Sequence, residues 1–290
     1  MVKMVKRANV TAVLFLCFLF LFSSASFFGD TAYAGWKFLT ALSTRRHYRD
    51  WQALETSHFR LRYTEADEQL APWLGREADQ AAKEVSTILQ HQQTVKPWLV
   101  ISPDQGTLRE VFGWGEGTGA LGVYVAETII ILSPQAWEWE VPAQRQAVFA
   151  EQGPLVHEYT HYVLDARAQG NYTRWFSEGL AQYVEYRVNG YEWIEASSSL
   201  ANPHYTKQEL EQYFDQLPNQ ALAYRQAFSM VSYLVELQGE AGLNKMIDLL
   251  GQGTPFYDAL RQNYGLEQLD FIAGWRSWVQ KGVRWYEIKG

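Results

Sequence analysis

The sequence predicts an α+β protein in which an N-terminal lobe built on a mixed sheet precedes a predominantly helical C-terminal lobe. Three observations support this prediction. Short apolar or alternating stretches typical of strands fall between residues 55 and 140. One long stretch with apolar residues at helical spacing lies among them. From residue 141 onward the periodic stretches have helical spacing, and Pro or Gly residues mark several of their ends.

The composition is that of a globular protein. Of the 290 residues, 47% are hydrophobic and 20% are charged, so the chain can bury a sizeable core. The net charge is −7, from 25 basic and 32 acidic residues. An acidic balance argues against a nucleic-acid partner.

The first 34 residues have the features of an export signal. Lys3, Lys6 and Arg7 precede a nearly unbroken apolar run, and Ala32-Tyr33-Ala34 fits a small-x-small cleavage site. We expect residues 1–34 to be a cleaved signal peptide. The alternative is an uncleaved membrane anchor, because residues 10–28 are 19 residues without a charge, which is close to a bilayer-spanning length. Either reading predicts an extracytoplasmic protein, secreted or membrane-anchored.

Cleavage at this site would leave a chain without cysteine, because Cys17 is the sole cysteine. The net charge would then be −9. A zinc site in such a chain must use histidine and carboxylate ligands. We expect residues 35–54 to be a linker and residues 55–288 to form one domain, with an α/β lobe at 55–140 and a helical lobe at 141–288.

The α/β lobe contains the strand signals. Residues 58–63 alternate as a half-buried strand does, and residues 97–102 form a buried apolar run. Residues 121–126 and 128–133 are typical of a strand pair, and residues 68–90 have helical periodicity. The glycine-rich turn at 113–119 is not a phosphate loop, because no Lys-Ser or Lys-Thr follows it.

The helical lobe contains seven periodic stretches. Gly153-Pro154 and Thr254-Pro255 are start signals, and Gly239 and Gly265 are stop signals. The predicted helices cover residues 142–167, 173–188, 207–214, 219–237, 242–250, 255–263 and 266–280.

The segment His157-Glu-Tyr-Thr-His161 is an HExxH motif within one of these helices. Residues four apart share a helix face, so both imidazoles can reach one metal ion. Glu158 is about 100° around the helix from His157. It lies near the metal without being a ligand, where it can act as a general base toward water. A chance match to this motif has a probability of about 1% in a chain of this length.

A second helix supplies a third candidate ligand. Glu178 stands near the start of the segment Trp175-Phe-Ser-Glu-Gly-Leu-Ala. Taken alone, Glu178 would be explained as a carboxylate favoured by the helix dipole. Beside HExxH it completes the three protein ligands that a catalytic zinc requires. We therefore predict Zn²⁺ held by His157, His161 and Glu178.

HExxH followed by a Trp-x-x-Glu-Gly-x-Ala segment resembles the gluzincin metallopeptidases. The tail from residue 223 onward is similar to bacterial peptidase-MA-like proteins, and the resemblance covers roughly residues 55–281. It implies a zincin-like fold, a zinc peptidase activity on peptide or protein substrates, and the same assignment of ligands and base. It also implies that an edge strand, which we place within residues 121–133, binds the substrate backbone.

The chain departs from the aminopeptidase pattern of that family. Residues 119–124 are nearest to the family's exopeptidase segment and lack the glutamate that would hold a substrate amine. Endopeptidase activity is therefore favoured.

Hydrolysis builds negative charge on the carbonyl oxygen, so a hydrogen-bond donor opposite Glu158 is expected. Tyr224 is the candidate, because it opens the helix that the resemblance singles out. His204 and Tyr205 are the alternatives.

Metal-bound histidines usually donate their second N–H to a carboxylate or carbonyl. Asp165, Gln182 and Glu185 are the candidates for this role, with a surface charge as the competing explanation for Asp165. We expect the histidines of the first lobe, namely His47, His58 and His91, to be structural.

Three functions remain open. The favoured one is an exported zinc endopeptidase. The second is a binding or regulatory protein on a peptidase scaffold with little turnover, which the intact Glu158 argues against. The third is metal-dependent hydrolysis of a non-peptide bond.

Overall fold

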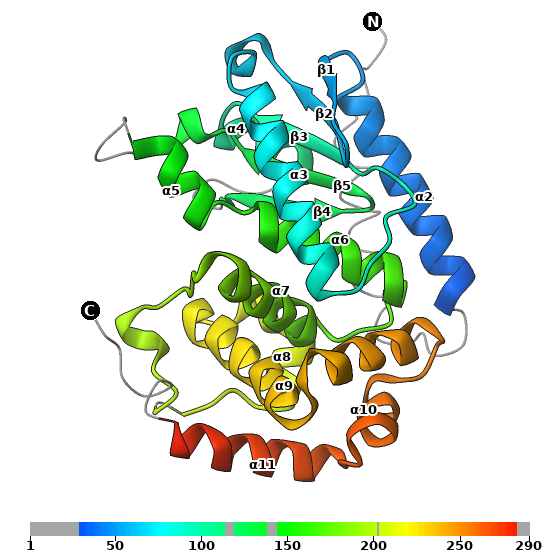
Figure 1. The fold of residues 1–290 in the computed structure, drawn as a ribbon, viewed down its shortest axis with the longest axis vertical. Helices are drawn as coiled ribbons and strands as arrows, with labels where there is room; N and C mark the ends of the chain where they lie inside the picture. The colour runs from blue at the N-terminus through cyan, green and yellow to red at the C-terminus, as the bar shows by residue number, and fades with distance from the viewer. Residues whose placement is uncertain (1–28, 114–118, 138–143, 202, 283–290) are drawn as a thin grey trace, which may run out of the picture.

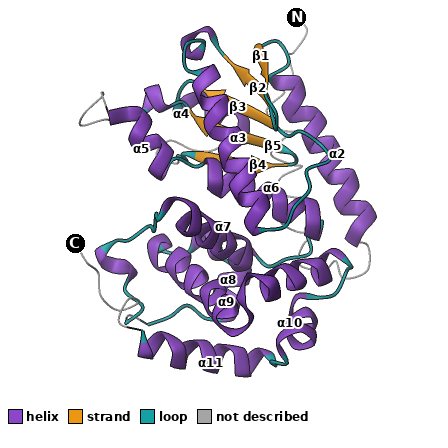
Figure 2. Ribbon diagram, viewed as in Figure 1, coloured by secondary structure: helices purple, strands orange, loops and turns teal. Residues whose placement is uncertain are grey.

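The computed structural model describes residues 29–113, 119–137, 144–201 and 203–282. A five-stranded mixed sheet forms the N-terminal side of the molecule and helices form most of the rest (Figures 1 and 2). The predicted α+β class with a sheet lobe and a helical lobe is confirmed. The glycine-rich turn lies largely outside the described residues.

The sheet has the strand order β1-β2-β3-β5-β4. Its strands are β1 (Gln52–Glu55), β2 (Arg60–Tyr63), β3 (Trp98–Ser102), β4 (Gly122–Val125) and β5 (Thr128–Leu132). β2, β3 and β5 are mutually parallel, whereas β1 and β4 are antiparallel strands on the two edges. The four predicted strands are therefore present, and β4 lies on an edge as expected.

The central strands are covered on both faces, as the continuous apolar run of β3 predicts. Leu99 and Ile101 face the main core with α3 (Ala71–Ile88), whereas Trp98 and Val100 pack on the opposite face with α4 (Gln105–Phe112). Because neighbouring residues of a strand point to opposite faces, one apolar run serves both layers.

The linker predicted in the N-terminal region needs correction. Residues 35–54 are not a linker: they contain most of α2 (Gly29–His47) and of β1. β1 pairs with β2 although its side chains are mostly exposed, which is why its sequence gives no strand signal. α2 begins before Ala34, so one continuous helix crosses the predicted cleavage site.

The helical lobe follows the predicted periodic stretches closely. The predicted 142–167 helix is two helices, because the chain turns at Gly153-Pro154 between them. The 219–237 and 242–250 stretches form a single assigned helix that is broken at Gln238 and Gly239, where Gly239 has φ +67°. The helices are α5 (Arg145–Gln152), α6 (Leu155–Ala168), α7 (Arg174–Asn189), α8 (Lys207–Gln212), α9 (Gln220–Gly251), α10 (Phe256–Tyr264) and α11 (Gln268–Lys281).

α6 is the central helix of the molecule. It packs against α3 on the sheet lobe and against α7 and α9 in the helical lobe. Most of its residues are buried, including Leu155, Tyr159 and Val163. The side chains of α6 are therefore fixed relative to both lobes.

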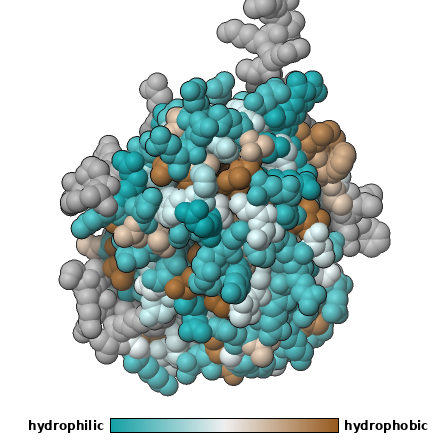
Figure 3. Space-filling model, turned by 45° about the horizontal axis from the view of Figure 1, so that its top comes forward, coloured by the Kyte–Doolittle hydropathy of each residue, from teal (hydrophilic) through white to brown (hydrophobic). Residues whose placement is uncertain are grey.

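The surface of one face is mainly hydrophilic, with hydrophobic residues in small groups (Figure 3). Among the described residues, no helix combines the length and apolar character needed to cross a bilayer. The apolar run at 10–28, on which the signal-or-anchor prediction rests, lies outside them.

Candidate metal centre

α6 carries the HExxH motif as predicted. Gly153 ends α5 and Pro154 starts α6, so the motif begins at the third residue of the helix. His157 and His161 lie on one face with ring centroids 4.9 Å apart. Glu158 is 6% exposed and His161 8%, so the motif lies at the floor of the site.

α7 brings Glu178 to the same place. α6 and α7 pack side by side, and Glu178 on the second turn of α7 is 1% exposed. The next residue, Gly179, allows α9 to approach closely, because a Cβ there would lie 2.4 Å from the carbonyl oxygen of Ala227. Glu178 thus directs its carboxylate toward α6, while Gly179 lets the backbone of α7 pack closely against α9.

The three predicted ligands converge. One donor atom from each of His157, His161 and Glu178 lies within 4.8 Å of the other two. Nε2 of His157 is 3.2 Å from Oε2 of Glu178, and Nε2 of His161 is 3.3 Å from Oε1. Two imidazoles and a carboxylate that face one point are the donor set of a catalytic zinc site.

The other ring nitrogens are already engaged. Nδ1 of His161 is 2.9 Å from Oγ of Ser177, and Nδ1 of His157 is 3.3 Å from Oε2 of Glu185. Gln182 donates to the same Glu185 oxygen at 3.1 Å. Partners of this kind fix the ring orientation, which leaves both Nε2 atoms free for a metal. The residues therefore fit zinc.

Opposing charges set the ionisation of the site. Although burial alone would raise the pKa of Glu178, the positive charge of Arg174 and the two histidines hold it below its usual range. Burial lowers the pKa of His161 to about 3. For His157 burial acts in the same direction, but hydrogen bonds to Glu178 and Glu185 and their charges raise its pKa well above the usual value.

Glu158 has the opposite shift from Glu178. Burial raises its pKa to about 7, and the charges of Glu178 and Glu185 add to this effect, while His157 and Arg174 oppose it. A carboxyl group with a pKa near neutrality is matched to proton transfer at physiological pH.

The edge strand lies directly on Glu158. A Cβ at Gly122 of β4 would be 2.7 Å from Cγ of Glu158 and equally close to Cβ of Pro154. The motif gives no indication of this contact. A glycine within a predicted strand is the only signal for a close approach.

Tyr224, the predicted donor, is on the second turn of α9. Its ring centroid is 6.5 Å from that of His157, and Trp193 and Phe214 pack against it at 5.3 and 5.2 Å. Burial raises its pKa well above the usual value, so its hydroxyl stays protonated. The structure thus places Tyr224 beside the cluster.

The alternative donors have other contacts. Nε2 of His204 is 2.7 Å from the carbonyl oxygen of Leu200, and its ring packs on Trp275. The hydroxyl of Tyr205 accepts a hydrogen bond from the backbone N–H of Asn219 at 3.0 Å.

Of the three predicted partners for the metal-binding histidines, Glu185 and Gln182 reach His157. Asp165 does not bond to either histidine. Its carboxylate contacts Tyr33, Lys37 and Tyr124 instead. Nor is it a surface charge, since it is 1% exposed.

Arg174 is a site residue that was not predicted from the sequence. Its Nη1 contacts Oε1 of Glu178, while Nε and Nη2 bond to Asp215 at 2.8–3.2 Å. The four-residue spacing between Arg174 and Glu178 is the signal that could have found it.

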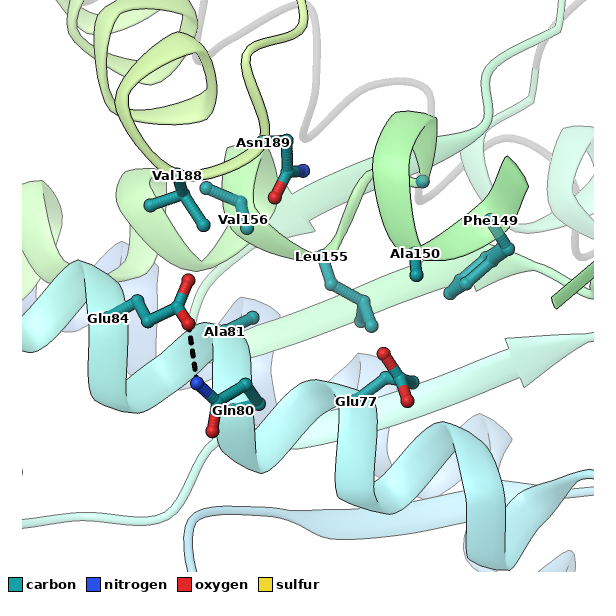
Figure 4. A pocket seen from close by; sticks show the side chains of 11 residues that line it. Glu77, Gln80, Ala81, Glu84, Phe149, Ala150, Leu155, Val156, Val188 and Asn189 are labelled. Atoms are coloured by element: carbon teal, nitrogen blue, oxygen red, sulfur yellow. Dashed lines mark hydrogen bonds between the residues drawn. The ribbon is translucent and has the colours of Figure 1, made fainter. Parts of the chain in front are cut away.

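A separate pocket between α3 and α5 is not part of this centre. It has a volume of about 60 Å³, and its carboxylates, Glu77 and Glu84, lie apart in Figure 4, with Gln80 donating to Glu84. No histidine lines it.

Residues 130–281, which are 152 of the 290 residues, match the Peptidase MA superfamily. The chain belongs to the Peptidase MA superfamily. The match runs from β5 to the end of α11, so it includes the helices that bring His157, His161 and Glu178 together. The predicted resemblance is confirmed at this level.

A solved structure titled "Structure of native yeast LTA4 hydrolase" is also similar, with 13% sequence identity and a TM-score of 0.48. The likeness covers 79% of this chain and 39% of that one, so this Peptidase MA chain spans less than half the length of that protein. No curated protein matches the sequence significantly.

Proposed function

We propose that this chain is an exported, zinc-dependent endopeptidase whose metal is held by His157, His161 and Glu178. The convergence of these donors beside Glu158 is the observation that carries the proposal. Membership of the Peptidase MA superfamily supports a zinc peptidase. The proposed endopeptidase specificity rests on the missing glutamate in residues 119–124, and the proposed export rests on the signal features of residues 1–34. The bacterial peptidase-MA-like proteins remain the proposed subgroup.

Each residue has a distinct task in this proposal. The Nε2 atoms of His157 and His161 and the carboxylate of Glu178 hold the ion. When bound, zinc supplies a Lewis acid that polarises the scissile carbonyl and makes water acidic enough to be deprotonated near neutral pH. Glu158 takes the proton from the attacking water and passes it to the leaving amine.

Tyr224 is the proposed donor to the developing oxyanion. It stays protonated because of its burial, and it approaches the cluster from α9, whereas Glu158 is on α6 and lies against β4. A donor and a base on opposite sides of the scissile bond suit a tetrahedral transition state.

The substrate backbone would add to the open edge of β4. β4 is the last strand in the described sheet and pairs there with β5 alone. An extended peptide can bond to such an edge, and Gly122 would bring it close to Glu158. Residues 119–126 contain no carboxylate that could hold a free amine, which favours internal cleavage.

Proteome-derived peptide profiling tests the proposal directly. Wild type and Glu158→Gln, matched for zinc content, are incubated with the same peptide pool. We expect internal cleavage by wild type and at least about 100-fold slower cleavage by Glu158→Gln.

Equal zinc content with no cleavage by either protein would favour a binding or regulatory protein on this scaffold. Terminal trimming by wild type would contradict the endopeptidase assignment alone.

A further inference from the structure

Asp165 is a buried carboxylate that the proposed reaction does not use. It lies four residues after His161 on α6 and is 1% exposed. Its oxygens accept hydrogen bonds from the hydroxyl of Tyr33 and from the hydroxyl of Tyr124, the latter at 2.5 Å. They also form an ion pair with the ammonium of Lys37 at 2.8 Å. These partners come from α2 and β4, so one carboxylate joins three separate elements.

Tyr33 and Tyr124 are suited to donate hydrogen bonds to Asp165. Burial, together with the Asp165 charge, raises the pKa of both Tyr33 and Tyr124 far above its usual value, so both remain hydrogen-bond donors. Tyr33 also fits closely against the turn after α6, because a Cβ at Gly170 would lie 2.6 Å from its ring.

A second ion pair holds the tip of the β4–β5 hairpin to α2. Glu127 sits in the tight turn between the strands, where it and Ala126 have φ of +62° and +43°. Arg45 donates to Glu127 at 2.8 Å, and Lys37 is 3.8 Å away. α2 is thus bonded to the hairpin at its tip and to α6 at Asp165.

β4 contacts α6 at two points. Gly122 lies on Glu158, and Tyr124 bonds to Asp165. Residues 158 and 165 are seven apart, which places them on nearly the same face of α6 and about 10 Å apart along its axis. Gly122 and Tyr124 are two residues apart and therefore share a face of the strand. A shift of β4 at the Tyr124–Asp165 contact would therefore also change how Gly122 lies against Glu158.

Polar contacts hold α2 beside a cavity of about 430 Å³ that is lined by residues of α2, α6 and the hairpin. Lys37, Glu127 and Asp165 line it together with apolar residues of α2. In Figure 1 α2 runs along the outside of the molecule. Its side chains Phe38 and Leu39 are 67% and 62% exposed.

We propose that Asp165 is a positioning residue for edge strand β4, and that the turn of α2 carrying Tyr33 and Lys37 is the clamp that holds it there. The clamp fixes the strand over Glu158, and its effect on substrates rests on the proposed function. It also means that residues 29–34 belong to the folded unit. Cleavage after Ala34 would remove Tyr33 from it, so the clamp favours an uncleaved N-terminal segment.

Hydrogen exchange and kinetics on full-length variants test the clamp. The variants are Tyr33→Phe, Lys37→Met, Asp165→Asn and the double variant Lys37→Met/Asp165→Asn. Arg187→Met is the matched control, because it breaks an ion pair of similar length with Glu240 on the helical lobe. Exchange is followed in residues 121–132 and, for comparison, in α9.

We expect Lys37→Met to speed exchange in residues 121–132 about tenfold, with no change in α9. KM for peptides should rise about tenfold, while kcat and zinc content are kept. Arg187→Met should leave exchange in residues 121–132, KM, kcat and zinc content unchanged. The double variant should exchange more slowly than Asp165→Asn alone, because the partly buried Lys37 is then not left without its nearest counterion.

Unchanged exchange in residues 121–132 in all four variants would overturn the clamp, whatever their melting temperatures. If Asp165→Asn has a lower melting temperature but the KM of wild type, Asp165 stabilises the fold without positioning β4 for substrate. Exchange does not require hydrolysis. An inactive wild type whose variants still loosen the hairpin would therefore contradict the proposed function and leave the clamp supported.

Discussion

Gly122 lies against Glu158 so closely that a Cβ on Gly122 would be 2.7 Å from Cγ and 2.9 Å from Oε1 of the glutamate. This contact ties the edge strand to the proposed base. The absence of a side chain at residue 122 therefore affects chemistry as well as packing.

Gly122→Ala should displace Glu158, β4 or both. We expect kcat/KM to fall about 100-fold, because a misplacement of about 1 Å can have that effect. Zinc content should be unchanged, since the nearest atoms belong to Glu158 and Pro154. Steady-state kinetics with elemental analysis checks both.

Gly35→Ala is the matched control for that substitution. Gly35 lies within α2 with nothing within 4 Å of a Cβ, so activity should stay at the wild-type level. Wild-type kcat/KM in Gly122→Ala would show that the contact does not position the base.

The pH profile of kcat/KM should fall on the acid side. Glu158 accepts a proton only when ionised, so activity is lost as pH falls through its pKa. Burial raises that pKa to about 7, and the positive charge of bound zinc would lower it. We therefore expect the acid limb at or below about pH 7 at saturating zinc. A rate that rises toward acid pH would exclude Glu158 as the base.

Zinc binding should release about one proton at pH 6. His157, with its raised pKa, is protonated there and must lose that proton to bind zinc, whereas His161, with a pKa of about 3, is already neutral. Apparent zinc affinity should therefore rise with pH, by about tenfold per pH unit below the pKa of His157.

Calorimetry in buffers of different ionisation enthalpy counts the protons. The measurement is made on Glu158→Gln, because the carboxyl group of Glu158 would otherwise titrate in the same pH range. Release of no proton or of two would contradict the assigned charge states.

Glu178→Ala should bind zinc at least about 100-fold more weakly, because loss of even an indirect partner of a ligand costs 10–100-fold. Competition with a chelating dye measures the affinity. Glu185→Ala, which removes the partner of His157 Nδ1, should show a smaller loss. If Glu178→Ala binds zinc as tightly as wild type, Glu178 is not the third ligand.

The sequence was sufficient to predict that His157, His161 and Glu178 lie together, because the signals for this arrangement are local. HExxH depends on helical spacing alone, and Glu178 stands in a short segment beside a glycine. The break at Gly239 was also indicated, since glycine acts through its own backbone. Gly153-Pro154 was identified as a start signal, although residues 142–167 were predicted as one helix.

The contacts around the centre could not be predicted in this way. Tyr33 and Asp165 are 132 residues apart, and no periodicity links them. α2 was missed because residues 29–34 were assigned to the export signal and the apolar residues of the helix show little helical periodicity. α4 was missed although its eight residues are amphipathic and Asp104 caps its start. β1 was missed because only one of its four residues is even partly buried.

Diffraction recorded on either side of the zinc absorption edge tests the central claim most directly. Crystals of the full chain grown with zinc should give one strong anomalous peak on α6 and α7. We expect it about 2.0–2.2 Å from Nε2 of His157, Nε2 of His161 and a carboxylate oxygen of Glu178. A peak elsewhere, or none at these three side chains despite bound zinc, would contradict the account.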